Sequence, residues 1–119
     1  MKSDHLNFRS GFRLSVCNAK SQGAVMVLPV GGKEGGPDNF HRQSDQWLFI
    51  VDGTGVAVVN GRKLKLDAGA MLLIEAGDKH EIRNTGRTLL KTVSVTCRLP
   101  IATRRPNCRR AQAPPSNFP

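Results

Sequence analysis

Short segments rich in β-branched and apolar residues, separated by Gly, Pro, Asn and Asp at regular intervals, constrain the fold of this chain more than any other feature. No segment shows sustained helical periodicity. The pattern therefore predicts an all-β barrel or sandwich. The expected strands are residues 11–17, 23–29, 46–52, 54–59, 62–66, 70–74, 79–83 and 88–97.

The turn signals sharpen this prediction. Asn60-Gly61 lies between two such segments, where a two-residue turn requires positive φ at both positions, and it predicts a tight hairpin. The strict alternation over residues 63–66 predicts that Leu64 and Leu66 face the interior and that the lysines face water. Residues 31–37 contain four glycines and a proline, and we expect a flexible loop there, at the barrel mouth.

A chain of 119 residues is long enough for one hydrophobic core. We expect a single barrel domain over residues 1–97, with its core motifs in 36–84, and an extended basic Pro/Arg-rich tail over 98–119. The apolar stretches are much shorter than the roughly 20 residues of a membrane span. The N-terminal residues have no apolar region typical of a secretory signal, so we expect a cytoplasmic location.

The formal charge of +9 is unevenly distributed along the chain. Residues 1–97 contain 13 Lys and Arg against 9 Asp and Glu, whereas residues 98–119 contain five arginines and no acid. No recognition-helix pattern or series of stacking aromatics accompanies the charge. The sequence therefore argues against a nucleic-acid partner, and non-specific binding through the tail ranks third among the functions below.

The most informative residues form the pattern Gly69-x5-Glu75-x-Gly77-x2-His80-x3-Asn84. This pattern resembles the second motif of the cupin family, G-x5-P-x-G-x2-H-x3-N, and departs from it only where Glu75 replaces the proline. The resemblance covers about residues 23–97 and extends to small single-domain bacterial cupins. It implies the cupin-type double-stranded β-helix, which is a jelly-roll barrel.

The first cupin motif, G-x5-H-x-H-x3,4-E-x6-G, is matched less completely. Gly53 supplies its closing glycine, and counting back places its glutamate position at Gln46, its second histidine at His41 and its first at Asn39. In metal-binding cupins these positions and the histidine of the second motif hold one metal ion. The resemblance thus implies a metal site formed by His41, Gln46, His80 and Asn39.

The donors implied by the resemblance are all neutral, so they do nothing to offset the charge of a divalent cation. Imidazole and amide donors suit Zn2+, Ni2+ or Cu2+ better than Mn2+ or Mg2+, and we expect weak binding or none. A hydrogen-bonding role without metal is about as well supported for Gln46 and better supported for Asn39. Asp45 is an alternative ligand, but strand alternation turns it outward if Gln46 points inward. Arg42, beside His41, is a candidate for binding an anionic substrate.

Two main functions remain open. The first is a metal-binding cupin, with oxygenase or isomerase activity on a small anionic substrate as one form of it. The second is a non-catalytic module that binds a small ligand and has a degraded metal site. The fold alone does not select between them. We also expect a homodimer, because a short barrel has strand edges to protect and the family commonly pairs them.

The end of the chain departs from the family. Small cupins of this kind continue after the last strand with a segment like Tyr-Val-Pro-Pro-Ala-Tyr, whereas this chain has a different run over residues 96–103. Codons for that run, read one nucleotide earlier, can encode Tyr-Val-Pro-Pro-Ala-Tyr-Arg-Asp. We therefore expect residues 96–119 to come from a shifted reading frame and to be dispensable for the barrel.

Overall fold

The computed structural model describes residues 1–36 and 44–98. They contain no helix and form nine strands. The strands are β1 (Gly11–Cys17), β2 (Ser21–Leu28), β3 (Lys33–Gly35), β4 (Ser44–Asp52), β5 (Gly55–Val59), β6 (Arg62–Leu66), β7 (Met71–Ile74), β8 (His80–Asn84) and β9 (Leu90–Arg98). No helix in this part of the chain has the length and apolar character that crossing a membrane requires.

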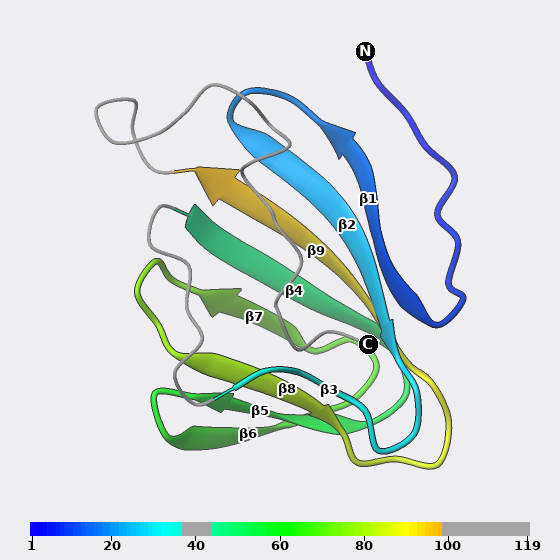
Figure 1. Cartoon of the computed structure of the whole chain (residues 1–119), viewed down its shortest axis with the longest axis vertical. Helices are drawn as coiled ribbons and strands as arrows, with labels where there is room; N and C mark the ends of the chain where they lie inside the picture. Colours follow the sequence, from blue (N-terminus) through cyan, green and yellow to red (C-terminus); the bar gives the residue numbers. More distant parts are fainter. Residues whose placement is uncertain (37–43, 99–119) are drawn as a thin grey trace.

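The strands form two antiparallel sheets that face each other (Figure 1). The five-stranded sheet has the order β1-β2-β9-β4-β7, and the four-stranded sheet has the order β3-β8-β5-β6. Consecutive strands repeatedly cross between the sheets, as in a jelly roll. The all-β barrel expected from the sequence is confirmed.

The core lies between the sheets, where strands such as β4 turn an apolar face inward. On β4, Leu48 and Ile50 are fully buried, while Trp47 and Phe49 on the opposite face are partly exposed. This period of two is the pattern of a strand with one face in a core. The buried cluster is Met26, Leu28, Leu48, Ile50, Ala57, Leu66, Leu72, Ile74, Ile82 and Leu90.

Most strands lie within two residues of their expected bounds, and those over 11–17 and 62–66 agree in full. The hairpin turn is confirmed by φ values of 50° at Asn60 and 80° at Gly61. The side chain of Asn84 closes a turn, donating to Leu28 O at 3.0 Å and Thr88 O at 2.8 Å. Its Oδ1 accepts a hydrogen bond from Gly86 N at 2.9 Å.

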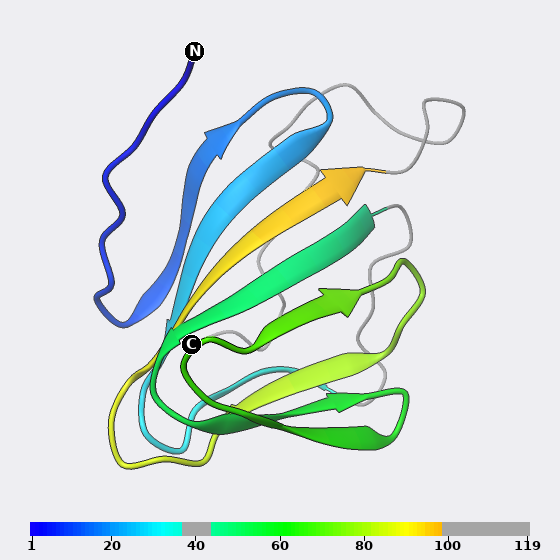
Figure 2. The same cartoon turned by 180° about the vertical axis from the view of Figure 1, so that it is seen from behind.

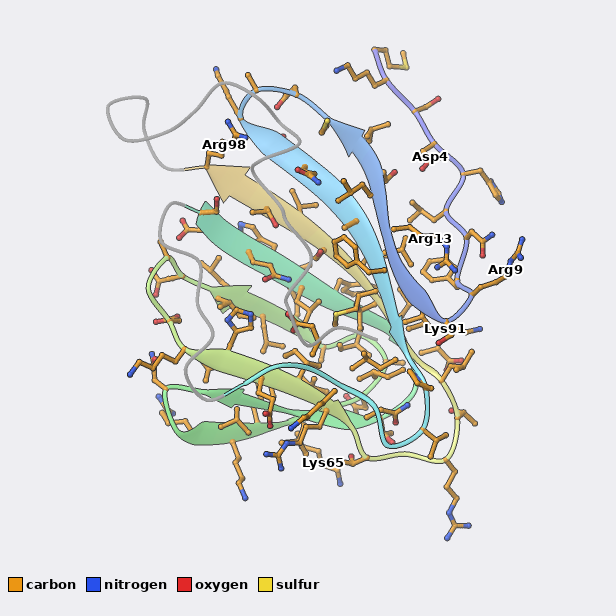
Figure 3. All side chains as sticks on the ribbon, in the orientation of Figure 1. Asp4, Arg9, Arg13, Lys65, Lys91 and Arg98 are labelled. Atoms are coloured by element: carbon orange, nitrogen blue, oxygen red, sulfur yellow. The ribbon has the colours of Figure 1, made fainter. Side chains whose placement is uncertain are left out.

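Two expectations were wrong. The loop expected over residues 31–37 contains β3, in which Lys33, Glu34 and Gly35 pair with β8. Hydrogen bonding to a neighbouring strand here overrides the weak strand propensity of glycine. Leu64 is 50% exposed although it is opposite buried Ala57, because β6 is an edge strand that covers only part of the interior. The lysines of β6 are exposed as expected, and Figure 3 labels Lys65.

Candidate functional site

One end of the barrel carries most of the buried polar side chains. The beginnings of β4 and β8 and the ends of β3, β7 and β9 meet at this end, on the left in Figure 1 and on the right in Figure 2. We call it the polar end and define it by the buried residues Gln22, Glu34, Ser44, Gln46, His80 and Thr96.

His80 is the first residue of β8, and its position depends on the turn before it. The Asp78 carboxylate accepts hydrogen bonds from Glu75 N and from Asn60 Nδ2, both at 2.9 Å. Asn60 Oδ1 also accepts from Lys79 N at 2.9 Å. Hydrogen bonds therefore connect the Asn60-Gly61 hairpin to the 75–79 turn, directly before His80.

Asp45 fixes the same turn from the other sheet. Its Oδ1 accepts a hydrogen bond from Ala76 N at 2.8 Å. On β4, Asp45 lies on the outer face, while Gln46, Leu48 and Ile50 are buried on the inner face. The expected alternation is present, and the Asp45 carboxylate positions the turn that precedes His80.

Glu34 on β3 is a charged neighbour of His80. His80 is fully buried and Glu34 is 2% exposed, and Glu34 Oε1 lies 3.8 Å from His80 Nε2. This distance is too long for a normal hydrogen bond, so the two groups interact mainly through charge. Glu34 Oε2 is buried and has no hydrogen-bond partner. The two side chains come from neighbouring strands and face the interior together.

Each ring nitrogen of His80 faces a different oxygen atom, that of Asp78 O at Nδ1 and that of Glu34 Oε1 at Nε2. Its Nδ1 lies 3.4 Å from the carbonyl oxygen of Asp78, which can accept a hydrogen bond from a protonated Nδ1. Nε2 is the nitrogen that faces Glu34. Burial lowers the pKa of His80, but the Glu34 carboxylate and Asp78 together raise that pKa by more, so the net shift is upward.

Gln46 faces the interior from the opposite sheet. It is 6% exposed and is opposite Thr96 on β9, which is in turn opposite Gln22 on β2. Three buried polar side chains thus form a row across three neighbouring strands. The row lies in the five-stranded sheet, whereas His80 and Glu34 lie in the four-stranded sheet.

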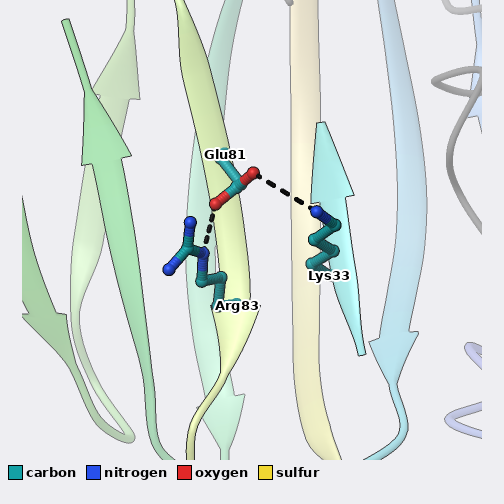
Figure 4. Close-up of polar contacts among 3 residues, drawn as sticks. All are labelled: Lys33, Glu81 and Arg83. Atoms are coloured by element: carbon teal, nitrogen blue, oxygen red, sulfur yellow. Dashed lines mark hydrogen bonds and ion pairs between the residues drawn. The ribbon is translucent and has the colours of Figure 1, made fainter. Parts of the chain in front are cut away.

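A second buried carboxylate, Glu81, follows His80 on β8 and therefore lies on the other face of that strand. Figure 4 shows Glu81 with Arg83 and Lys33. It forms an ion pair with Arg83, and its Oε2 lies 4.0 Å from Lys33 Nζ. Two cations therefore already neutralise Glu81. Glu34 and Glu81 are both 2% exposed, but only Glu34 faces the interior beside His80.

The structure brings together only part of the expected site. His80 and Gln46 both face the interior at the polar end, whereas Asn39, His41 and Arg42 lie outside the described residues. Their roles as ligands stay predictions. Glu34 was not identified from the sequence, because a three-residue strand between glycines has no alternation to reveal it. Gln22 was also missed, because it precedes the segment in which a strand was expected.

Comparison with known proteins decides the family. Residues 24–96 match the cupin domain family. The chain belongs to this family. The double-stranded β-helix is accordingly the cupin fold.

Two curated relatives and one solved structure show how far the similarity extends. The chain is 30% identical over 56 residues to the tetracenomycin polyketide synthase protein TcmJ of Streptomyces glaucescens, covering 47% of this chain and 38% of that protein. It is 32% identical over 74 residues to an oxalate-binding protein of Thermotoga maritima, covering 60% of this chain and 58% of that protein. The chain thus spans less than two thirds of each curated relative.

The solved structure is that of a predicted oxalate decarboxylase from Thermotoga maritima. It superimposes with a TM-score of 0.68 at 28% sequence identity, covering 74% of this chain and 79% of that chain. One of these relatives is named for binding a small molecule, oxalate.

Proposed function

We propose that this cupin binds a divalent metal ion at the polar end and, through it, a small molecule. The observation that carries the proposal is the buried pair of His80 and Glu34, in which Glu34 Oε2 has no partner. A buried carboxylate oxygen without a hydrogen bond is unfavourable unless a cation or a donor satisfies it. A metal ion bound to His80 Nε2 would satisfy it.

The donors fit a divalent cation better than the sequence alone suggests. Glu34 supplies the negative charge that the set of His41, Gln46, His80 and Asn39 lacks, and it comes from the strand beside His80. His41 is our proposed third strong ligand. Among residues 1–36 and 44–98, no three His, Cys, Asp or Glu side chains are grouped to hold a metal, so the proposal depends on that third ligand.

The same donors suggest which metals bind. Two imidazoles and one carboxylate favour Zn2+, Ni2+ or Cu2+ over Mn2+ or Mg2+, which prefer sites made of oxygen donors. A bound ion would act as a Lewis acid for an oxygen of the ligand. The charge of the ion, reduced by one by Glu34, favours a small anionic molecule, and Arg42 is the residue that we propose to pair with the anionic group of that molecule.

Oxalate is the first ligand to test, because the Thermotoga maritima relative is named for binding it. Oxygenase or isomerase activity stays a prediction that depends on an open position on the metal. The alternative is a module that binds its ligand without metal, using His80 and Glu34 as a donor and an acceptor. A third function, non-specific nucleic-acid binding by the tail, requires a steep dependence of affinity on salt.

The test is metal analysis of protein purified without added metal, followed by calorimetric titration with Zn2+ and Ni2+. We expect one ion per chain in the wild type, loss of binding in His80→Ala, and at least about tenfold weaker binding in Glu34→Gln. Glu81→Gln is the matched control, because Glu81 is equally buried but faces the other way. Wild-type protein that binds oxalate but no metal would support the metal-free module instead.

We also propose that the chain forms a homodimer through the outer face of the five-stranded sheet. Trp47 lies opposite Leu73 and Val95, and the neighbouring row contains Phe49 and Met71. These five side chains are 38% to 62% exposed. A contiguous apolar sheet face of this kind favours burial against a second copy.

A further inference from the structure

Gln22 is the most deeply buried amide at the polar end. It lies near the start of β2 and is 1% exposed. Its side chain is on the same face as Met26 and Leu28, which belong to the core cluster. The start of β2 is at the same end of the barrel as the end of β9, where Figure 3 labels Arg98.

Neither end of the Gln22 amide has a hydrogen bond among residues 1–36 and 44–98. Both Nε2 and Oε1 are buried and without a partner. On the same sheet, by contrast, the buried hydroxyl group of Thr92 is hydrogen-bonded, because its Oγ1 donates to Met26 O at 2.8 Å. A buried amide without partners destabilises the folded protein, so a residue kept in this state is best explained by a ligand that completes it.

The chemistry of the amide indicates what that ligand presents. A glutamine amide offers a donor and an acceptor side by side in one plane. A carboxamide, or a protonated carboxylic acid, offers the complementary acceptor and donor in the same geometry. An ionised carboxylate satisfies only Nε2 and leaves two oxygen acceptors facing each other.

We infer that Gln22 recognises the ligand of this barrel and that the ligand carries a carboxamide or neutral carboxylic acid group. The inference rests on the proposed function, since it assumes that the polar end holds a small molecule. The metal side of the site, at His80 and Glu34, binds the charged end of the ligand. Gln22, on the opposite sheet, binds its uncharged end.

The binding test compares two probes of nearly equal size. Oxamate has one carboxylate and one carboxamide, whereas oxalate has two carboxylates. We expect Zn2+-loaded wild-type protein to bind oxamate more tightly than oxalate. Gln22→Met, which keeps the length of the side chain, should weaken oxamate binding at least about tenfold and change oxalate binding less.

The second test needs no ligand. In ligand-free protein, Gln22→Met removes an amide without partners and should raise the thermal midpoint by about 3 °C. The matched control is Thr92→Val, which removes a hydroxyl that is already hydrogen-bonded and should lower the midpoint. A substitution that stabilises the protein while weakening ligand binding is the expected signature of a recognition residue.

The outcomes separate the two proposals. If wild-type protein binds metal and oxamate but Gln22→Met leaves oxamate affinity unchanged, the role of Gln22 is refuted and the proposed function stands. A lower midpoint in ligand-free Gln22→Met also refutes the inference, because the amide must then have had a partner. If wild-type protein binds neither probe nor any metal, both proposals fail together.

Discussion

Replacing Glu34 by glutamine should reverse the direction in which the protein environment shifts the pKa of His80. In the wild type, burial lowers that pKa and Glu34, with Asp78, raises it by more. Glu34→Gln keeps the shape of the side chain and removes its charge. Burial then dominates, and the His80 imidazole should titrate below its ordinary range instead of above it.

The size of the effect follows from the geometry. Two unit charges 3.8 Å apart attract each other by about 4 kcal/mol at an effective dielectric constant of about 20. The cost of burying both ions offsets part of this, but removing one partner leaves the other charge unpaired and typically costs about 3–5 kcal/mol. We therefore expect metal-free Glu34→Gln to be less stable than the wild type by about 3 kcal/mol while His80 is protonated.

The pH dependence has a definite sign. Because the folded pKa of His80 is raised, its contribution to stability is fully present below the unfolded value of 6.5 and is lost as the pH rises through the folded pKa. The difference in unfolding free energy between wild type and Glu34→Gln should therefore be largest near about pH 6 and shrink in alkaline solution.

The assay is an NMR titration of the His80 ring in metal-free protein, combined with urea unfolding at several pH values. Glu81→Gln is the control, because Glu81 is equally buried but neutralised by Lys33 and Arg83 on the other face. An upward-shifted His80 pKa that survives Glu34→Gln, or an equal drop in Glu81→Gln, would refute the reasoning.

Three further predictions concern the rest of the molecule. Trp47→Lys should convert a dimer into a monomer in sedimentation velocity at micromolar concentration, and a wild-type monomer would refute the homodimer. Leu66→Ala should cost about 3 kcal/mol in urea unfolding but Leu64→Ala less than about 1 kcal/mol, and equal costs would contradict the edge position of β6. Truncation after Arg98 should shift the thermal midpoint by less than about 2 °C, and the nucleotide sequence over codons 92–100 should show an open alternative frame.

The structure changes the position at which the chain should be cut to test whether the tail is dispensable. The shifted frame was expected to begin at residue 96, but Thr96 is fully buried and β9 continues to Arg98, whose N donates to Lys20 O at 2.8 Å. Cutting before Thr96 would remove a fully buried residue of the strand together with the hydrogen bond of Arg98. The dispensable part is therefore tested by cutting after Arg98.

Local patterns predicted strands such as β4 because one face of the strand is buried and the other is more exposed. The Asn60-Gly61 turn and the alternation on β4 needed no tertiary information, and the spacing of the second motif was enough to single out His80. Each of these features is encoded within one short stretch of sequence, of which the second motif, residues 69–84, is the longest.

The part of the site that the sequence did not reveal depends on pairing between segments that are distant in the sequence. Glu34 is next to glycine-rich residues that indicate a loop, and only its pairing with Ile82 on β8 turns it toward His80. Leu64 shows the same limit, since its exposure depends on β6 having no neighbour on one side. The sequence alone does not show whether such a residue is buried against a neighbouring strand or exposed at an edge, because that depends on the order of the strands in the sheet.

The most direct test of the proposed site is a crystal structure of the protein with Zn2+, with anomalous diffraction measured at the zinc edge. The proposal predicts one strong peak at the polar end, about 2.0–2.2 Å from both His80 Nε2 and a Glu34 carboxylate oxygen. A peak bonded to neither residue, or no peak at saturating Zn2+, would contradict it.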